Sequence, residues 1–365
     1  MRERRTVSMN IQLVKAQTVI EFGSPLVERT SLLSPPTGKQ VRVRIRACGL
    51  CHSDLHFHEG HLNLGAGNSL ALSDLGVTPP FVLGHEPSGE IVDFGADSGL
   101  DSADLGRAVI VYPWIGCGHC ELCNNGQDHQ CAQPQVIGMQ QPGGQADHLI
   151  VPDARFLIDA TGVDPLLAGS YACSGLTSYS ALKKVERLRE DWIGIIGVGG
   201  VGMMALAVAK AMGFRKVAAI DVNDQRLGVA RDEFGADLII NSKAPEAAQT
   251  LLDATGGLAG VIDFVGSTDT ADLAIGLLKI NGELVVVGMF GGELRVPLPI
   301  LSIKQLNLRG SFVGSVDELN ELMSYVRAGK VKPIPAVAMP VHQVNDAITQ
   351  LKAGKVDGRI VLTHD

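Results

Sequence analysis

The chain has 365 residues, which is long for one ordinary hydrophobic core, and we expect two domains. Its 45% hydrophobic and 19% charged residues are typical of a soluble globular protein, and its net charge of -8 argues against nucleic acid or an anionic membrane as partner. No apolar run reaches the roughly 18 residues of a membrane span. The basic N-terminus lacks the apolar segment of a signal peptide, so we expect a cytoplasmic protein.

The first 160 residues are rich in Gly, Pro and short β-like runs, which predicts a mostly β domain. An alternating run at 40–49 predicts a strand that ends just before Cys51. Cys48 forms a C-x2-C pair with Cys51, but we interpret it as a core residue of the strand because Ser53 and Asp54 follow Cys51.

Three histidines follow in what we interpret as a polar loop, at positions 56, 58 and 61. Two of the three are expected to be merely solvated.

Four of the seven cysteines lie within residues 116–131 in the pattern C-x2-C-x2-C-x7-C, namely Cys117, Cys120, Cys123 and Cys131. In a reducing compartment clustered cysteines are more often metal ligands than disulfides. Four thiolates close a tetrahedral shell, so we predict a structural zinc site. An iron–sulfur cluster or disulfides are the alternatives. His119 and His129 of the same lobe are interpreted as solvated.

A second, open metal site is predicted from residues far apart in the chain. Cys51 follows a strand, His85 and Glu86 follow another apolar run, and Cys173 precedes a predicted helix. Strand ends and helix starts bring distant residues together around a site. Two Cys and one His would hold a zinc ion with its fourth position free, as catalytic zinc sites do. Each residue alone is more often a core hydrophobe or a hydrogen-bonded histidine.

A dinucleotide site is predicted after the apolar strand 192–196. Gly197, Gly199 and Gly202 form G-x-G-x-x-G and, with Gly200, open a predicted helix, and the next strand ends in Asp221, 19 residues after Gly202. This order of strand, glycines, helix, strand and acidic residue is typical of dinucleotide binding.

Asp221 would accept hydrogen bonds from the adenosine ribose and repel a 2′-phosphate, so NAD is favoured over NADP. Arg226 nearby would soften that preference.

Strands and helices continue to alternate to about residue 314, which predicts a parallel, doubly wound α/β sheet of about six strands. Beyond it, two helices and a last short strand at 358–363 are expected to pack back onto the first domain. We therefore predict a zinc-binding catalytic domain, residues 1–175 and 311–365, with a dinucleotide-binding Rossmann domain, residues 176–310, inserted in it.

With these parts side by side, the sequence resembles the zinc-dependent medium-chain alcohol dehydrogenases. The resemblance covers nearly the whole chain and rests on the motifs CHSD, GHEPSGEIVDFG, CGHCELC and GVGGVG in the order and spacing of that family. Segments such as DLGVTPPFVLGHE and CSGLTSY are similar to the prokaryotic, NAD-dependent, tetrameric members. The resemblance implies a GroES-like catalytic domain, an alcohol or carbonyl substrate, NAD, two zinc ions per chain and a homotetramer.

The resemblance also implies roles for individual residues. Cys51, His85 and Cys173 would bind the catalytic zinc, with Glu86 able to coordinate it transiently and Asp54 orienting a ligand. Ser53 would accept the substrate proton and His56 would pass it to solvent. The residues implied in cofactor contact are Thr177 and Val265 near the nicotinamide and His52 and Arg359 at the pyrophosphate.

Two rival functions remain at this point: a polyol or sugar dehydrogenase of the same superfamily, and a non-catalytic NAD-binding protein. The first usually has glutamate where Cys173 stands, and the second would not need the complete set of site residues. The sequence does not identify the substrate, although Trp114 and Phe290 are expected to shape its pocket.

Overall fold

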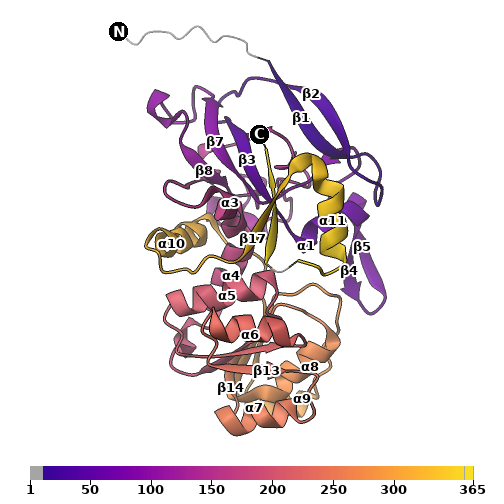
Figure 1. Cartoon of the computed structure of the whole chain (residues 1–365), viewed down its shortest axis with the longest axis vertical. Coiled ribbons are helices and arrows are strands. Elements are labelled where there is room, and N and C mark those ends of the chain that lie inside the picture. The colour runs from indigo at the N-terminus through magenta and orange to yellow at the C-terminus, as the bar shows by residue number, and fades with distance from the viewer. Residues whose placement is uncertain (1–10, 357, 365) are drawn as a thin grey trace.

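The computed structural model describes residues 11–356 and 358–364. It has two lobes stacked along its long axis (Figure 1). The upper lobe holds the N-terminal strands together with the last two strands and helix α11, and the lower lobe holds a second sheet with helices α5 to α9 around it. Helices α4 and α10 lie between the two.

The upper lobe is built on a seven-stranded sheet in the order β10-β8-β7-β3-β18-β17, with β9 also paired to β3. Its strands are β3 (Val41–Leu50), β7 (Pro87–Phe94), β8 (Ala108–Val111), β9 (His148–Val151), β10 (Leu157–Asp159), β17 (Ala336–Pro340) and β18 (Arg359–Thr363). Strand β18 runs antiparallel to β3, so the C-terminal segment lies beside the central strand of the upper lobe. Strand β17, parallel to β18, was not predicted.

Smaller elements complete this lobe. A three-stranded sheet has the order β2-β1-β6, and β4 and β5 form a separate hairpin. Their bounds are β1 (Gln12–Val19), β2 (Val27–Leu33), β4 (His61–Gly65), β5 (Asn68–Ala71) and β6 (Phe81–Val82). The helices are α1 (His52–Glu59), α2 (Glu121–Asn124), α3 (Pro165–Ala168) and α11 (Val344–Lys352).

The prediction of a polar loop around the three histidines was wrong, because helix α1 contains His56 and His58, and strand β4 begins at His61. The Asp54 side chain accepts a hydrogen bond from the Cys51 amide and caps the helix, and Gly60 ends it with φ 85°. His58 is buried, and its Nε2 lies 2.7 Å from the Ser24 carbonyl oxygen.

The lower lobe contains a six-stranded sheet in the order β13-β12-β11-β14-β15-β16, and every neighbouring pair is parallel. The strands are β11 (Trp192–Ile196), β12 (Lys216–Asp221), β13 (Leu238–Asn241), β14 (Leu258–Asp263), β15 (Leu278–Val286) and β16 (Asn307–Gly310). The connecting helices are α4 (Ser174–Lys184), α5 (Gly200–Ala211), α6 (Asp224–Asp232), α7 (Ala247–Thr255) and α8 (Thr268–Leu277). The predicted doubly wound α/β fold is confirmed.

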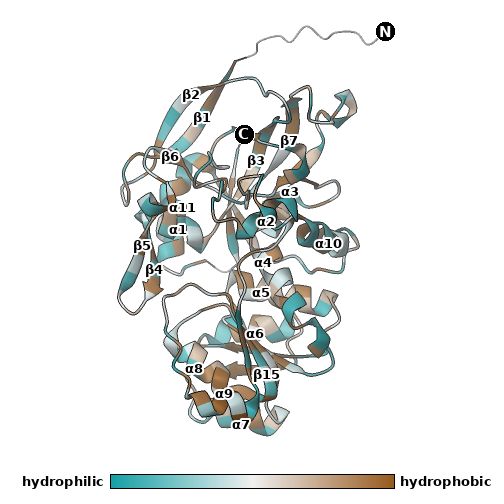
Figure 2. Ribbon diagram, turned by 180° about the vertical axis from the view of Figure 1, so that it is seen from behind, coloured by the Kyte–Doolittle hydropathy of each residue, from teal (hydrophilic) through white to brown (hydrophobic). Residues whose placement is uncertain are grey.

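Of two further helices, one was predicted from the sequence and the other was not. Helix α10 (Val316–Arg327) was predicted, and its Ser315 side chain accepts a hydrogen bond from the Glu318 amide as an N-cap. Helix α9 (Leu298–Lys304), coloured as largely hydrophobic in Figure 2, was missed. Prolines at 297 and 299 indicate a loop, although a proline is tolerated in the first helical turn. None of the helices in the described ranges is both long and apolar enough to cross a bilayer.

Candidate active site and metal centres

The fold brings Cys51, His85 and Cys173 together from three separate segments. Cys51 caps helix α1, His85 lies between β6 and β7, and Cys173 precedes helix α4. All three side chains are buried, and their ligand atoms lie within 4.8 Å of one another together with a carboxylate oxygen of Glu86. The structure therefore places every ligand predicted for the open metal site around one point.

His85 is held in one orientation by Asp54. Its Nδ1 lies 3.0 Å from Asp54 Oδ1, and Oδ2 of the same carboxylate accepts a 2.9 Å hydrogen bond from the Cys51 amide. The other ring nitrogen, Nε2, is buried and has no hydrogen-bond partner among the described residues. Burial lowers the pKa of His85, but the Asp54 carboxylate outweighs it and raises that pKa well above its usual value. A metal ion at Nε2 would satisfy the orphaned atom.

The two thiols fit a tetrahedral zinc ion. Cys51 Sγ and Cys173 Sγ lie 3.9 Å apart, and a zinc with bonds of about 2.3 Å to each sulfur places the two sulfurs about 3.8 Å apart. The hydrogen bond from the Cys173 thiol lowers the pKa of Cys51, and the same contact raises the pKa of Cys173. The lowered pKa of Cys51 favours the thiolate form, which is the form that binds zinc.

Glu86 lies beside these ligands and is fully buried. Its Oε1 forms an ion pair with the Arg359 guanidinium of β18, and its Oε2 is buried without a described partner. Burial raises the pKa of Glu86, against the opposing effect of Arg359. Position 49 has to be glycine, because a Cβ there would overlap Glu86 Oε2.

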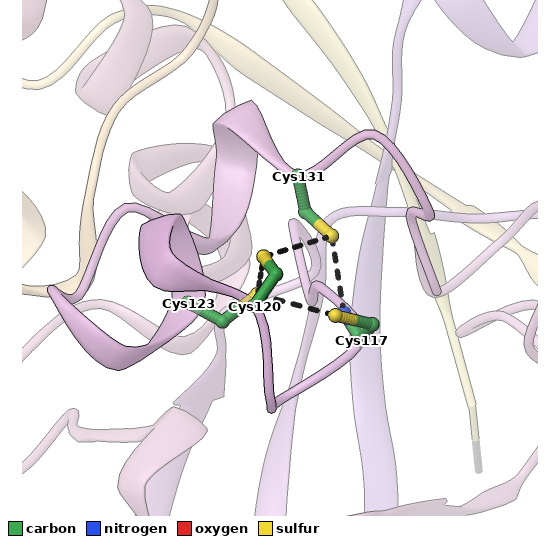
Figure 3. Close-up of side chains that lie close together, drawn as sticks. All are labelled: Cys117, Cys120, Cys123 and Cys131. Carbon is green, nitrogen blue, oxygen red and sulfur yellow. Dashed lines mark hydrogen bonds between the residues drawn. The ribbon is translucent and has the colours of Figure 1, made fainter.

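The four-cysteine lobe is closed around a single point (Figure 3). The Sγ atoms of Cys120 and Cys123 lie 3.5 Å apart, those of Cys120 and Cys131 3.8 Å, and those of Cys117 and Cys123 4.0 Å. These distances are those of four thiolates on one tetrahedral ion. A multi-iron cluster would hold its thiolates further apart, and all seven cysteines are free, so no disulfide links them.

Local contacts hold the same lobe in place. A hydrogen bond from the His119 amide contributes most to lowering the pKa of Cys117, which is about 6. Asp128 is buried and accepts hydrogen bonds of 2.8 and 3.1 Å from the Arg155 guanidinium, a pair that was not predicted. His119 is exposed and His129 is partly buried, and neither belongs to the ligand set.

The glycine-rich turn between β11 and α5 has the geometry of a phosphate-binding turn. Gly197 has φ 85°, and a Cβ there would lie 2.6 Å from Val265 Cγ2. A Cβ at Gly202 would overlap the Gly197 carbonyl oxygen, so the glycine permits close packing of helix on strand. A Cβ at Gly199 would meet nothing within 4 Å, which leaves that side of the turn open for a ligand to approach the backbone.

Asp221 ends strand β12 beside this turn, as predicted. Its Oδ2 accepts a 2.8 Å hydrogen bond from the Val198 amide, and its Oδ1 accepts bonds of 2.8 and 3.0 Å from the amides of Val222 and Asn223. The carboxylate is therefore fixed by three backbone donors and retains lone pairs for a ribose hydroxyl. Arg226, in the first turn of helix α6, is partly buried.

The remaining predicted site residues lie near the metal group or the turn. Ser53 Oγ is 3.8 Å from Cys51 Sγ, and the Thr177 amide donates to the Cys173 carbonyl in the first turn of helix α4. His52 is exposed and His56 partly buried, both on helix α1.

Arg359 also lies close to the glycine-rich turn, because its Nη1 would be 3.9 Å from a Cβ at Gly200. Its guanidinium thus lies between that turn and Glu86.

Aromatic rings pack against His85 of the open metal group. The rings of Trp114 and Phe57 lie 5.4 and 5.8 Å from the His85 ring, and the ring of Phe312 lies 5.6 Å from that of Trp114. The Trp114 Nε1 donates a 2.9 Å hydrogen bond to the Ala172 carbonyl. Trp114 was expected here, whereas Phe57 and Phe312 had no distinguishing sequence signal. Phe290 is 74% exposed.

Comparison with known proteins agrees with this arrangement. Residues 37–161 match the alcohol dehydrogenase GroES-like domain, and residues 200–328 match the zinc-binding dehydrogenase family. The chain is 33% identical over 353 residues to an NAD-dependent alcohol dehydrogenase of Sulfurisphaera tokodaii, covering 96% of this chain and 99% of that protein. An alcohol dehydrogenase of Geobacillus stearothermophilus is 32% identical, with 96% and 98% covered.

Solved structures give the same result. The alcohol dehydrogenase of the archaeon Aeropyrum pernix superposes with a TM-score of 0.84 at 31% identity, covering 96% of this chain and all of that one. An acetophenone reductase of Geotrichum candidum in complex with NAD superposes with a TM-score of 0.81 at 28% identity, with 96% and 97% covered.

The chain belongs to the zinc-dependent medium-chain alcohol dehydrogenase family. The predicted family, fold class, reaction class and cofactors, NAD and zinc, are thereby confirmed.

Replacement of Cys123 by Ser should remove one zinc ion per chain and lower the thermal unfolding temperature, because the lobe loses the ion that closes it. Zinc per chain is measured by atomic emission and unfolding by calorimetry. The matched control is Cys48→Ser, a buried cysteine outside both ligand groups, which should keep both ions. A Cys123→Ser protein with two zinc ions and unchanged unfolding would contradict the structural assignment.

Proposed function

We propose that Cys51, His85 and Cys173 hold the catalytic zinc of an NAD-dependent alcohol dehydrogenase. The single observation that supports this most is the buried His85 Nε2, which has no hydrogen-bond partner in the described part of the chain and lies in a group with two thiols. Three ligands from this set leave one position of a tetrahedral ion for substrate, with Glu86 beside it. The four-cysteine lobe, in contrast, offers no free position.

Zinc at this site would act as a Lewis acid toward the substrate oxygen, and NAD would accept the hydride. The chain's own contribution is to remove the alcohol proton. Ser53 Oγ, 3.8 Å from Cys51 Sγ, is close enough to the metal group to accept that proton. His56 is three residues further along helix α1, on the same face, and would pass the proton to solvent.

The cofactor would lie along the open side of the glycine-rich turn, with its pyrophosphate at the N-terminus of helix α5. Gly199 and Gly200 would approach the phosphates, and Gly197 and Gly202 would shape the turn. Arg359, already close to Gly200, would add a positive charge there.

Other side chains would hold the two ends of the cofactor. Asp221 would accept a hydrogen bond from the adenosine ribose, while Arg226 lies in the first turn of helix α6, the helix that follows β12. Val265 and Thr177 would line the nicotinamide, Val265 because it packs beside Gly197 and Thr177 because it follows Cys173 by one turn of helix α4. His52, exposed beside the metal group, would contact the pyrophosphate.

Glu86 is proposed to coordinate the catalytic ion only transiently. One of its oxygens is engaged by Arg359 and the other is without a described partner, and a carboxylate oxygen of Glu86 lies within 4.8 Å of the other ligand atoms. Glu86 would thus offer an oxygen to the ion, while the ion pair with Arg359 keeps the carboxylate beside the other ligands.

The walls of the site favour an alcohol, aldehyde or ketone with an aliphatic or aromatic substituent. The rings of Trp114 and Phe57 pack against His85 and that of Phe312 against Trp114, and a hydrophobic wall accepts apolar groups better than several hydroxyls. A polyol or sugar substrate is less favoured for the same reason, and Cys173 stands where such enzymes usually have glutamate.

The proposed division into a catalytic domain, residues 1–175 and 311–365, and a Rossmann domain, residues 176–310, follows the two large sheets. β3 and β18 pair within one sheet although they are far apart in sequence, while β11 to β16 form the other.

Cys173→Ala should abolish alcohol oxidation and remove one zinc ion per chain while NADH still binds, because the glycine-rich turn is untouched. Ser53→Ala should keep both zinc ions and lower kcat about 10²- to 10⁴-fold, the usual contribution of general base catalysis. The measurements are zinc content, NADH fluorescence titration and initial rates with a panel of alcohols. Retained turnover in a Cys173→Ala protein lacking that ion would refute the zinc assignment.

Asp221→Gly should raise the KM for NAD far more than that for NADP, since it removes an acceptor for the ribose hydroxyl and a repulsion toward the 2′-phosphate. Because the substitution also frees the amides of Val198, Val222 and Asn223, the informative quantity is the ratio of kcat/KM for the two cofactors. An unchanged ratio would remove the ribose argument.

A homotetramer is proposed as the assembly. A tetramer with dihedral symmetry needs two different self-complementary surfaces, and two exposed apolar surfaces among the described residues could serve as these. The first is at the foot of the lower lobe, where β16 ends its sheet with all four residues exposed and Leu298 and Ile303 of helix α9 are 74% and 73% exposed (Figure 2). The second is on the outer hairpin of the upper lobe. There Leu13 of β1 pairs with Leu32 of β2, on one face, at 61% and 68% exposure.

Light scattering should give a mass of four chains for the wild type. Ile303→Glu and Leu32→Glu should each split the tetramer, because a charge in the middle of an apolar contact is costly to bury. Each should give dimers held by the surface that remains. A monomeric wild type, or two variants that both stay tetrameric, would exclude this assembly.

A cytoplasmic location is proposed because all seven cysteines are free thiols and six belong to the two metal groups. Cell fractionation with a tagged chain is the direct measurement.

A further inference from the structure

Hairpin β4–β5 belongs to the upper lobe, but its end contacts the lower lobe at residues 291–292 (Figure 1). Ala66 and Gly67 form the two-residue turn, with φ 52° and 75°, which suits a tight hairpin. A Cβ on Gly65 would lie 2.9 Å from the Gly292 carbonyl oxygen and 3.0 Å from that of Gly291. The backbones of the two lobes thus touch where only glycine fits.

Asn63 joins the two lobes at this point through its amide group. Its Nδ2 donates to the Phe290 carbonyl oxygen across 3.4 Å, and its Oδ1 accepts a 3.0 Å hydrogen bond from the Gly65 amide. A Cβ on Gly291, whose φ is 89°, would overlap the same side-chain amide. At 3.4 Å the bond to Phe290 is long, and a movement that brings the lobes closer would shorten it.

The segment 288–292 is itself fixed to the turn that follows β14. The amides of Gly288, Phe290 and Gly292 donate to the carbonyl oxygens of Asp263, Val265 and Gly266 at 3.0, 3.2 and 2.9 Å. Val265 in turn packs against Gly197 of the phosphate-binding turn. A contact made by Asn63 at Phe290 therefore reaches Val265 through one further backbone hydrogen bond.

The base of the hairpin is equally well fixed to the upper lobe. Lys352 of helix α11 forms a 2.9 Å ion pair with Glu59 at the end of helix α1, and the Leu72 amide donates to the Gly60 carbonyl at 2.9 Å. The Lys352 contact lowers the pKa of Glu59. Asn63 and Phe290 are each held by their own lobe. The distance between the Asn63 amide and the Phe290 carbonyl therefore depends on how far apart the two lobes are.

We propose that Asn63 is a positioning residue of the dehydrogenase reaction, which clasps the 288–292 segment across the two lobes and so holds Val265 against the nicotinamide half of the cofactor. The proposal rests on the assignment of Val265 to the nicotinamide site. Loss of the clasp lets the lobes separate more easily, so the cofactor dissociates faster while the catalytic residues stay intact.

The test is Asn63→Asp in the full-length enzyme with both zinc ions. The substitution keeps the oxygen that accepts from the Gly65 amide and replaces the donor by an oxygen that faces the Phe290 carbonyl. We expect the Kd for NADH and the KM for NAD to rise about 3- to 10-fold. Zinc content and unfolding temperature should be unchanged, and kcat should be equal or higher. Asn63→Ser, which removes the donor without adding charge, should act in the same direction.

The matched control is Asn68→Asp, which puts the same charge on strand β5 of the same hairpin and has no described contact with segment 288–292. An NADH Kd for Asn63→Asp within twofold of that control would overturn the proposal, as would a fall in kcat with an unchanged KM for NAD. Failure of the proposed function would appear elsewhere, as a wild-type chain that binds no NADH or a Cys173→Ala chain that keeps its turnover.

Discussion

The carboxylate of Asp54 is the constraint on which the open metal group depends. One of its oxygens accepts from the Cys51 amide and the other contacts His85 Nδ1, so a single buried side chain fixes two of the three proposed ligands. Its first contact is also the cap of helix α1, so the start of that helix and the orientation of the imidazole are set together. The third proposed ligand, Cys173, lies directly before helix α4, and the start of that helix places it at the same point.

A second constraint is the buried pair of Glu86 and Arg359. An isolated charge in this position would be costly, and each group offsets the burial of the other. Arg359 lies on β18, which pairs with β3 just before Cys51, and it also approaches Gly200 of the lower lobe. The C-terminal strand thereby links the metal group to the dinucleotide turn, although it is more than 150 residues further along the chain than either of the two.

The two lobes meet through contacts of different kinds. Near the metal group the Arg359 side chain of the upper lobe approaches the Gly200 backbone of the lower lobe. At the outer edge it is backbone against backbone, where Gly65 meets Gly291 and Gly292. Neither of these contacts involves Cys51 or His85, which both belong to the upper lobe.

The sequence alone determined what depends on local pattern. The cysteine spacing predicted the closed lobe, and the glycines after an apolar strand predicted the dinucleotide turn, because in both cases the chemistry lies within a few dozen consecutive residues. Helix α1 and helix α9 were not predicted. The histidines of α1 and the prolines of α9 indicated loops, and both helices are short.

Only the tertiary structure decided the relations between distant segments. It showed that the Asp54 carboxylate contacts the His85 ring, that Arg359 pairs with Glu86, that Phe57 packs against His85 and Phe312 against Trp114, and that Asn63 touches the opposite lobe. None of these pairs has a fixed spacing in the chain, since each depends on how two sheets and their connections pack. Local geometry depends on neighbouring residues in the sequence. Whether two distant buried side chains contact each other depends instead on the packing of the whole fold.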